Sequence, residues 1–92
     1  MTDMTDRITV TKETKVRDHE QTPVGSVGPA YDWEASDGRK FWASEAFVMF
    51  TGQEILVFEY DKDGSIDFLE VAGGRGISFD DAKSDLERYL NE

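Results

Sequence analysis

The sequence predicts an α+β fold, with an antiparallel β-meander of four to five strands and a C-terminal amphipathic helix packed on one face. Alternating apolar and polar residues run through residues 30–71, interrupted by turn-forming pairs, as in a meander of half-buried strands. Nine of the eleven aromatic residues lie between Tyr31 and Phe68, which is enough apolar bulk for one modest core. The period then changes to helical after the glycine-rich segment at residues 73–76. A chain of 92 residues is expected to form a single small domain.

The N-terminal third contains one short strand between two irregular segments. Residues 1–6 are polar and are expected to be a disordered N-terminus. Within residues 7–16, Ile8 and Val10 alternate with threonines, which predicts a strand with one buried face. Residues 17–30 combine a polar run with closely spaced proline and glycine, and they are expected to form a long loop.

The next segment predicts a hairpin. Residues 31–36 alternate in strand fashion, and Asp37-Gly38 is a signal for a two-residue turn in which both residues need positive φ. The return strand begins at Arg39. Residues 43–50 fit either a helix or a central strand buried on both faces. The strand is favoured because residues 51–54 form a turn into another strand-like run.

A second hairpin follows. The pattern predicts strands at residues 55–60 and 66–71, with the acidic segment at residues 61–65 as the turn between them. Residues 72–77, rich in glycine, are expected to be a flexible connector to the helix.

The helix at residues 78–91 has the clearest sequence signals. Ser78 is a good N-cap, and Asp81 three residues later completes a capping-box pattern. The carboxylates of Asp80 and Asp81 also suit the positive end of the helix dipole. One stripe is apolar and contains Phe79, Ala82, Leu86, Tyr89 and Leu90.

The charge balance restricts the function. The chain has 20 acidic and 10 basic residues, for a formal net charge of −10. Residues 1–30 contain five acids and four bases, so nine of the ten net negative charges lie in residues 31–92. A surface of this sign repels nucleic acid and anionic membranes, and it attracts basic protein surfaces.

The residue types for most catalytic chemistry are missing. The absence of cysteine excludes disulfides, thiolate metal sites and thiol catalysis. His19, the sole histidine, lies in a polar segment, and no Ser-His-Asp pattern is present. The carboxylates follow solvated faces, and none is set apart as a general acid. No catalytic residue is therefore assigned, and the chain is not expected to be an enzyme.

Two segments resemble ligand-binding loops without matching them. Residues 61–70 resemble an EF-hand calcium loop that has lost two residues, including its third acidic position and its glycine. Residues 73–78 precede a helix as phosphate-binding loops do, but they lack the third glycine or the Lys-Ser/Thr ending that such loops require. A tight acidic turn and a connector are the favoured interpretations, so neither a metal nor a cofactor is expected.

The remaining candidate is a protein-binding acidic patch. On the predicted strands, turns and helix, the acids expected to contact a basic partner are Asp32, Glu34, Glu59, Asp61, Asp63, Asp67, Glu70, Asp81 and Asp85. Aromatic side chains set among them, such as Trp33, Trp42 or Tyr60, are candidates for the hot spots of such an interface, and core burial is the alternative for each.

In size and charge the chain resembles the small inhibitors that phages and mobile elements use against nucleic-acid-binding defence enzymes, including anti-CRISPR and anti-restriction proteins. This resemblance implies a non-enzymatic DNA-mimic inhibitor that binds a basic nucleic-acid-binding protein and does not bind nucleic acid directly. Three alternatives remain: an immunity protein against a toxin nuclease, a regulatory domain whose acidity serves only solubility, and an enzyme that uses His19 with carboxylates. No signal peptide or membrane-length apolar run is present, so a cytoplasmic location is expected, in the host cytoplasm if a phage encodes the protein.

Overall fold

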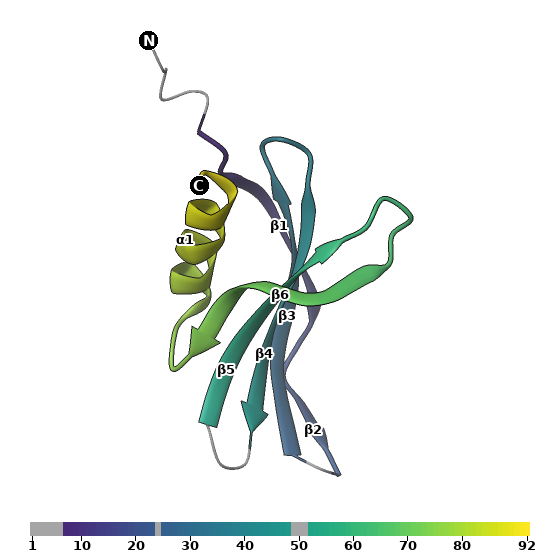
Figure 1. The fold of residues 1–92 in the computed structure, drawn as a ribbon. Coiled ribbons are helices and arrows are strands. Elements are labelled where there is room, and N and C mark those ends of the chain that lie inside the picture. Colours follow the sequence, from purple (N-terminus) through teal and green to yellow (C-terminus); the bar gives the residue numbers. More distant parts are fainter. Residues whose placement is uncertain (1–6, 24, 49–51) are drawn as a thin grey trace.

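One antiparallel sheet and one C-terminal helix make up the described part of the protein (Figure 1). The computed structural model describes residues 7–23, 25–48 and 52–92. The predicted α+β meander with a C-terminal helix is confirmed. The predicted disordered N-terminus, residues 1–6, lies outside the described residues. The elements are β1 (Val10–Arg17), β2 (Glu20–Thr22), β3 (Gly25–Ala35), β4 (Lys40–Val48), β5 (Gly52–Tyr60), β6 (Ile66–Arg75) and α1 (Phe79–Leu90).

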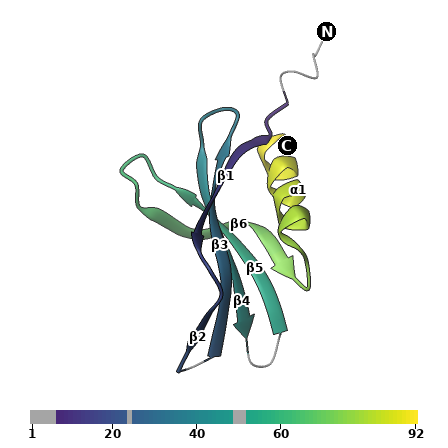
Figure 2. The ribbon, with the colours of Figure 1, turned by 180° about the vertical axis from the view of Figure 1, so that it is seen from behind.

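The sheet is a meander whose first strand is interrupted. Its order is β1-β3-β4-β5-β6, and all neighbours are antiparallel. The short β2 also pairs with β3, on the same side as β1 but farther along it. β1 and β2 therefore act together as one edge strand, which crosses the front of the sheet in Figure 2. This explains why six strands give a five-stranded meander.

Both hairpin tips use the same three-residue loop. In the first, the Ala35 amide donates to the Arg39 carbonyl at 2.9 Å, and Gly38 follows the turn at φ 93°. In the second, the Asp61 amide donates to the Ser65 carbonyl at 2.7 Å, with Gly64 at φ 87°. Only the glycine needs positive φ in this type of loop. The predicted two-residue turn at Asp37-Gly38 is wrong by one residue, and the acidic turn at residues 61–65 is confirmed.

The predicted loop at residues 17–30 is wrong, because most of it belongs to β2 and β3. β3 accommodates its proline through a bulge, since the register with β4 shifts between Val27 and Ala30. A bulge leaves a residue outside the ladder, so the missing amide hydrogen of Pro29 costs no strand pairing. Gly28 is in the same bulge, and a Cβ there would collide with the Glu45 side chain.

The predicted connector at residues 72–77 is also mostly strand, because β6 continues to Arg75. Gly73 lies opposite Leu56 in the β5–β6 ladder and has φ 114°. A Cβ at this position would overlap the backbone carbonyl of Ile55. Glycine is therefore present for a close approach of two strands, and the connector shrinks to the residues around Gly76 and Ile77.

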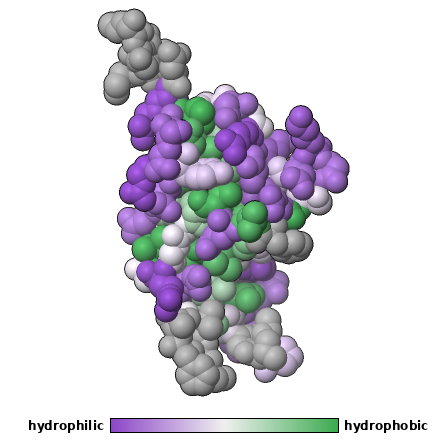
Figure 3. Space-filling view, in the orientation of Figure 1, coloured by the Kyte–Doolittle hydropathy of each residue, from purple (hydrophilic) through white to green (hydrophobic). Residues whose placement is uncertain are grey.

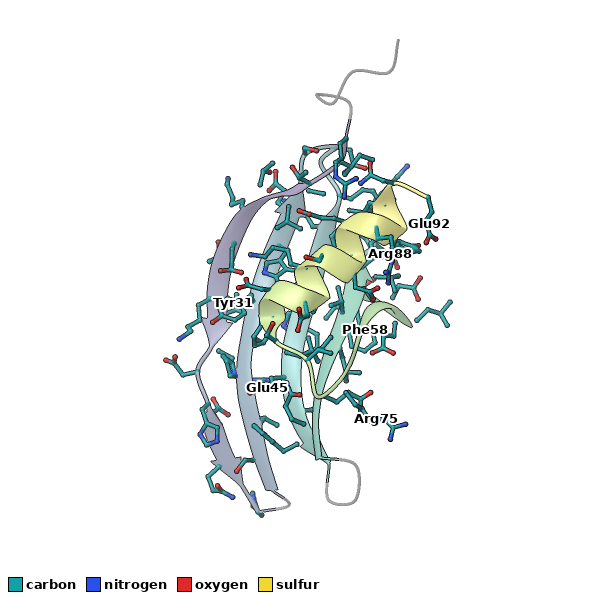
Figure 4. The ribbon with its side chains drawn as sticks, turned by 90° about the vertical axis from the view of Figure 1, so that its left-hand side faces the viewer. Tyr31, Glu45, Phe58, Arg75, Arg88 and Glu92 are labelled. Carbon is teal, nitrogen blue, oxygen red and sulfur yellow. The ribbon has the colours of Figure 1, made fainter. Side chains whose placement is uncertain are left out.

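The helix covers one face of the sheet and starts with the predicted capping box. The Ser78 hydroxyl accepts from the Asp81 amide at 3.1 Å, and the Asp81 carboxylate accepts from the Ser78 amide at 3.2 Å. Ala82, Leu86 and Leu90 are buried on the sheet side. Figure 4 shows α1 lying diagonally over the upper part of the strands. The core beneath it also contains Trp33, Ala35, Phe41, Ala43, Ile55, Val57 and Ala72.

Polar side chains of α1 and of its C-cap residue Asn91 accept hydrogen bonds from backbone amides at both edges of the sheet. The Glu87 carboxylate accepts from the Val10 amide of β1 at 2.8 Å, and the Asn91 side chain accepts from the Ile8 amide at 2.9 Å. On the opposite edge, Asp85 accepts from the Gly73 amide of β6 at 3.2 Å. The helix thus satisfies backbone donors on β1, on the segment before it and on β6.

We expect Gly73→Ala to destabilise the fold and Gly74→Ala to leave it nearly unchanged. The first adds a strained φ and a clash with backbone, which together cost about 1–3 kcal/mol or more. The second places a Cβ at 3.6 Å from the Ile77 side chain, an ordinary contact. Chemical denaturation of both variants measures the difference, and equal stabilities would contradict the close approach of β5 and β6.

Candidate protein-binding surface

Two cations on the helix side of the sheet each pair with one acid there. Arg39 donates twice to Glu59, at 2.8 and 2.7 Å, and its guanidinium lies over the rings of Phe41 and Tyr89. The Glu59 hydrogen bond raises the pKa of Arg39 further above its usual value. Glu59, predicted to contact a partner, is therefore ion-paired and lies on the helix side.

Lys83 has a similar role on α1. Its ammonium lies 5.4 Å from the Trp33 ring centroid and 3.1 Å from the Glu13 carboxylate, which also accepts from the Trp33 indole at 2.8 Å. Burial acts to raise the pKa of Glu13, but the hydrogen bonds from Lys83 and Trp33 outweigh it and the pKa is lowered. Trp33 is 1% exposed, so core burial is its role, as the alternative interpretation expected.

The opposite face of the sheet has no helix over it in the described residues. We call it the open face. Side-chain alternation opposite the core residues of β3, β4 and β5, together with the strand register, assigns residues to it. Its members on those three strands include Asp32, Glu34, Trp42, Ala46, Glu54, Leu56, Phe58 and Tyr60.

An aromatic row crosses the open face. Trp42 and Phe58 are register partners on β4 and β5, and their rings stack with centroids 6.1 Å apart. Leu56 lies beside them and all three are partly exposed. At one end, the guanidinium of Arg17 lies 5.8 Å from the Trp42 ring centroid and donates to the Gly28 carbonyl and the Ser44 hydroxyl. The row therefore offers apolar and aromatic surface next to a fixed cation.

A groove of about 780 Å³ lies between the two hairpin tips. It is lined from β1, β3, β4, β5 and both turns. Figure 1 shows the two hairpin tips diverging from each other. The Tyr60 hydroxyl donates to Asp32 at 2.6 Å across β4. Burial and this hydrogen bond raise the pKa of Tyr60 to about 12.

Both acidic and basic side chains line the groove. Glu34 has Lys12 as its register partner on β1 and Lys40 on β4. Lys62 also lines the groove. Glu34, one of the predicted binding residues, is thus flanked by two bases, whereas Asp32 is engaged by a neutral phenol.

The acids along the β5–β6 hairpin are less compensated. At the tip, Asp63 accepts from the Ser65 amide and hydroxyl, and the hydroxyl bond is the main reason that its pKa is lowered. Asp61 and Asp67 are also exposed in this hairpin, and Asp67 accepts from the Leu69 amide. Leu69, at 74% exposed, has the most exposed large apolar side chain in the described residues.

Two carboxylates lie beside the aromatic row on the open face. Glu70 is the register partner of Phe58, and Glu54 lies farther along β5, opposite Arg75 of β6. Burial, and secondarily the charge of Glu54, raise the pKa of Glu70. The sequence pointed to Glu70 but missed Glu54, although the alternation through residues 54, 56, 58 and 60 places it on the face of Phe58 and Tyr60.

The predicted helix acids serve the fold. Asp81 is the capping-box carboxylate, and Asp85 binds both the Gly73 amide and the Arg88 guanidinium. In Figure 4, Arg88 and Glu92 project from the exposed side of α1. The structure therefore groups Asp32, Glu34, Asp61, Asp63, Asp67 and Glu70 around the open face and its hairpins. Glu59 also lines the groove but is paired with Arg39, and Asp81 and Asp85 lie apart on α1.

The other candidates from the sequence are His19 and the carboxylate-rich segments. His19 contacts the Phe47 ring edge-on, with centroids 6.4 Å apart, and it does not line the groove. Across residues 7–23, 25–48 and 52–92, no group of three or more His, Cys, Asp or Glu side chains is placed to hold a metal ion. The one described helix is too short and too polar to span a bilayer.

No protein-family model, curated protein or solved structure matches this chain.

We expect the phenol of Tyr60 to titrate near pH 12 and to make stability fall in alkali. Below pH 10 it is protonated in both folded and unfolded chains. Between pH 10 and 12 only the unfolded chain releases the proton, so the free energy of unfolding decreases as pH rises. Tyrosinate absorbance against pH measures this, with Tyr60→Phe as control. A wild-type titration that lacks a late-titrating tyrosine would contradict the Asp32 contact.

Proposed function

We propose that this protein is a non-enzymatic acidic inhibitor that binds a basic, nucleic-acid-binding surface of a partner protein, as a DNA mimic does. The observation that carries the proposal is a group of exposed acids along the β5–β6 hairpin. Within the described residues Asp61, Asp63 and Asp67 are exposed and make no ion pair, and neither does the exposed Glu70 farther along β6.

These acids lie on exposed turns and beside exposed apolar surface. Space-filling representation shows polar side chains on the helix and the projecting hairpins, with apolar ones gathered between them (Figure 3). Carboxylates around an apolar centre suit protein recognition, because charge steers the encounter while buried apolar contacts stabilise the complex. Direct nucleic-acid binding is opposed by the net charge of −10.

The partner class follows from the sign and the density of this charge. A protein groove that holds nucleic acid is lined with lysine and arginine, and rows of exposed carboxylates can occupy the positions of phosphates. The inhibitor would be stoichiometric, and in a phage or mobile element it would act in the host cytoplasm. An immunity protein against a toxin nuclease uses the same surface chemistry and differs in the partner alone.

The first test is affinity capture from host lysate, followed by binding measurements with the purified partner. Binding should weaken as salt rises, since exposed charges are screened over about 10 Å at 0.1 M ionic strength. Nucleic acid and this protein should compete for the partner. Equal affinity at high salt, or a complex that still binds its nucleic acid, would overturn the proposal.

Charge reversal separates steering from general acidity. Asp61→Lys with Asp67→Lys should slow association with the captured partner by about tenfold at low salt and change dissociation less. Asp63 is spared because it holds the turn. The matched control, Asp80→Lys with Glu92→Lys, changes the net charge equally, at the start of α1 and two residues after its end. Stopped-flow or surface-based kinetics measure both, and equal slowing by the two double variants would assign the effect to net charge alone.

A further inference from the structure

Aspartate is followed directly by glycine at two places in the chain, Asp37-Gly38 and Asp63-Gly64. Each pair occupies the same position in a three-residue hairpin loop, and all four residues are exposed. Both glycines have positive φ, and both glycine amides donate to the backbone carbonyl three residues earlier at 2.9 Å. The two loops therefore form a matched pair within one molecule, and their clearest difference is the set of donors to the aspartate carboxylate.

We propose that Asp37-Gly38 is a site of spontaneous covalent modification, at which aspartate converts to isoaspartate through a cyclic succinimide, and that Asp63-Gly64 is protected from this reaction. An Asp-Gly pair is the sequence most open to this chemistry. Glycine has no side chain to obstruct the approach of its nitrogen to the preceding carboxyl group, and it lets the backbone rotate. This modification does not depend on the proposed function.

The reaction needs only water as a co-reactant. The nitrogen of Gly38 attacks the γ-carboxyl carbon of Asp37 in its protonated form, a new C–N bond forms, and the amide hydrogen and the carboxyl hydroxyl leave together as water. Water then adds to one of the two ring carbonyl carbons. Breaking the C–N bond at the original main-chain carbonyl gives isoaspartate, and breaking the new bond restores aspartate. Isoaspartate keeps the mass and charge of aspartate and adds one carbon to the backbone.

Hydrogen bonds to the carboxylate distinguish the two pairs. Within the described residues, Oδ1 of Asp37 accepts from the Arg39 amide alone, at 3.1 Å. Oδ1 of Asp63 accepts both from the Ser65 hydroxyl at 2.7 Å and from the Ser65 amide at 3.0 Å. These bonds, the hydroxyl bond first, lower the pKa of Asp63, so the protonated form that reacts is rarer there. The hydroxyl bond must also break before the carboxyl group can turn toward the nitrogen of Gly64.

Conversion of Asp37 is expected to change the contacts of Arg39. The loop gains one backbone carbon and the carboxylate branches from a different atom, so its bond to the Arg39 amide is lost. Arg39 pairs with Glu59 of β5, and its guanidinium lies over the rings of Phe41 and Tyr89. The converted protein should therefore lose part of the attachment of the first hairpin to β5 and α1, and it should unfold at a lower denaturant concentration.

The test is prolonged incubation of the folded 92-residue chain in neutral buffer. Proteolysis followed by electron-transfer fragmentation in a mass spectrometer locates isoaspartate, because its additional main-chain bond gives diagnostic fragments. Isoaspartate should accumulate at Asp37 about tenfold faster than at Asp63, since one hydrogen bond to a charged group is worth about that factor in rate. Equal rates would contradict the protection of Asp63, and absence of isoaspartate at Asp37 would overturn the site.

Incubation in denaturant separates the fold from the sequence. The loops are then absent, so the two Asp-Gly pairs should react at similar rates. A tenfold difference that persisted in denaturant would be a property of the neighbouring residues and would overturn the structural explanation.

Ser65→Ala removes the hydroxyl donor without changing the charge. It should raise the rate at Asp63 to nearly that at Asp37 and leave the rate at Asp37 unchanged. The matched control is Ser26→Ala, which removes a hydroxyl that donates to Gln21 and should change neither rate. A rate at Asp63 that stayed low in Ser65→Ala would show that the hydroxyl bond does not protect this pair.

Asp37→Glu tests the consequence for stability, because its longer side chain would have to close a larger and less favourable ring. During incubation, denaturation midpoints should fall for the wild-type chain in step with its isoaspartate content and stay constant for Asp37→Glu. An equal decline in both proteins would assign the loss of stability to another site.

Discussion

The structure depends on the packing of one amphipathic helix against one face of a curved sheet. Ala82, Leu86 and Leu90 bury the helix stripe over a core supplied by β3, β4, β5 and β6. A helix of 12 residues is about 18 Å long, whereas an 11-residue strand such as β3 extends about 36 Å. The helix therefore cannot cover the whole sheet. Its side of the sheet holds the main core, and the second face retains exposed apolar surface.

The bases are distributed over both faces of the sheet. On the helix side, Arg39 and Lys83 each contact an acid and at least one ring. On the other face, Arg17 lies over the Trp42 ring, and register partners of its acids include Lys12, Lys40 and Arg75. At the β5–β6 hairpin, Asp61, Asp63 and Asp67 are exposed and make no ion pair within the described residues.

Periodicity predicted the elements whose side chains alternate regularly, and local backbone constraints decided the rest. The meander and the capping box at Ser78 followed from spacing, whereas spacing alone left residues 43–50 open between helix and strand, and β4 shows the strand as far as Val48. The β3 bulge and the extension of β6 did not, because their glycines and proline look like loop residues until the opposing strand is present. Gly73 illustrates the difficulty, since its function is to let β6 approach the Ile55 carbonyl. No local pattern contains that information.

The sequence predicted which acidic residues are candidates for the site, but not which of them lie together in the structure. Sequence alternation correctly placed Asp32 and Glu34 on one face, yet it could not show that Glu59 pairs with Arg39 on the other. An ion pair across strands depends on register, and register depends on loop length. The predicted length of the first hairpin loop was one residue too short. Glu54 was overlooked although strand alternation through residues 54, 56, 58 and 60 places it on the open face. Strand register decides which acidic residues share one surface and which of them are paired with bases. Both must be known before the acids of such a chain can indicate a binding surface.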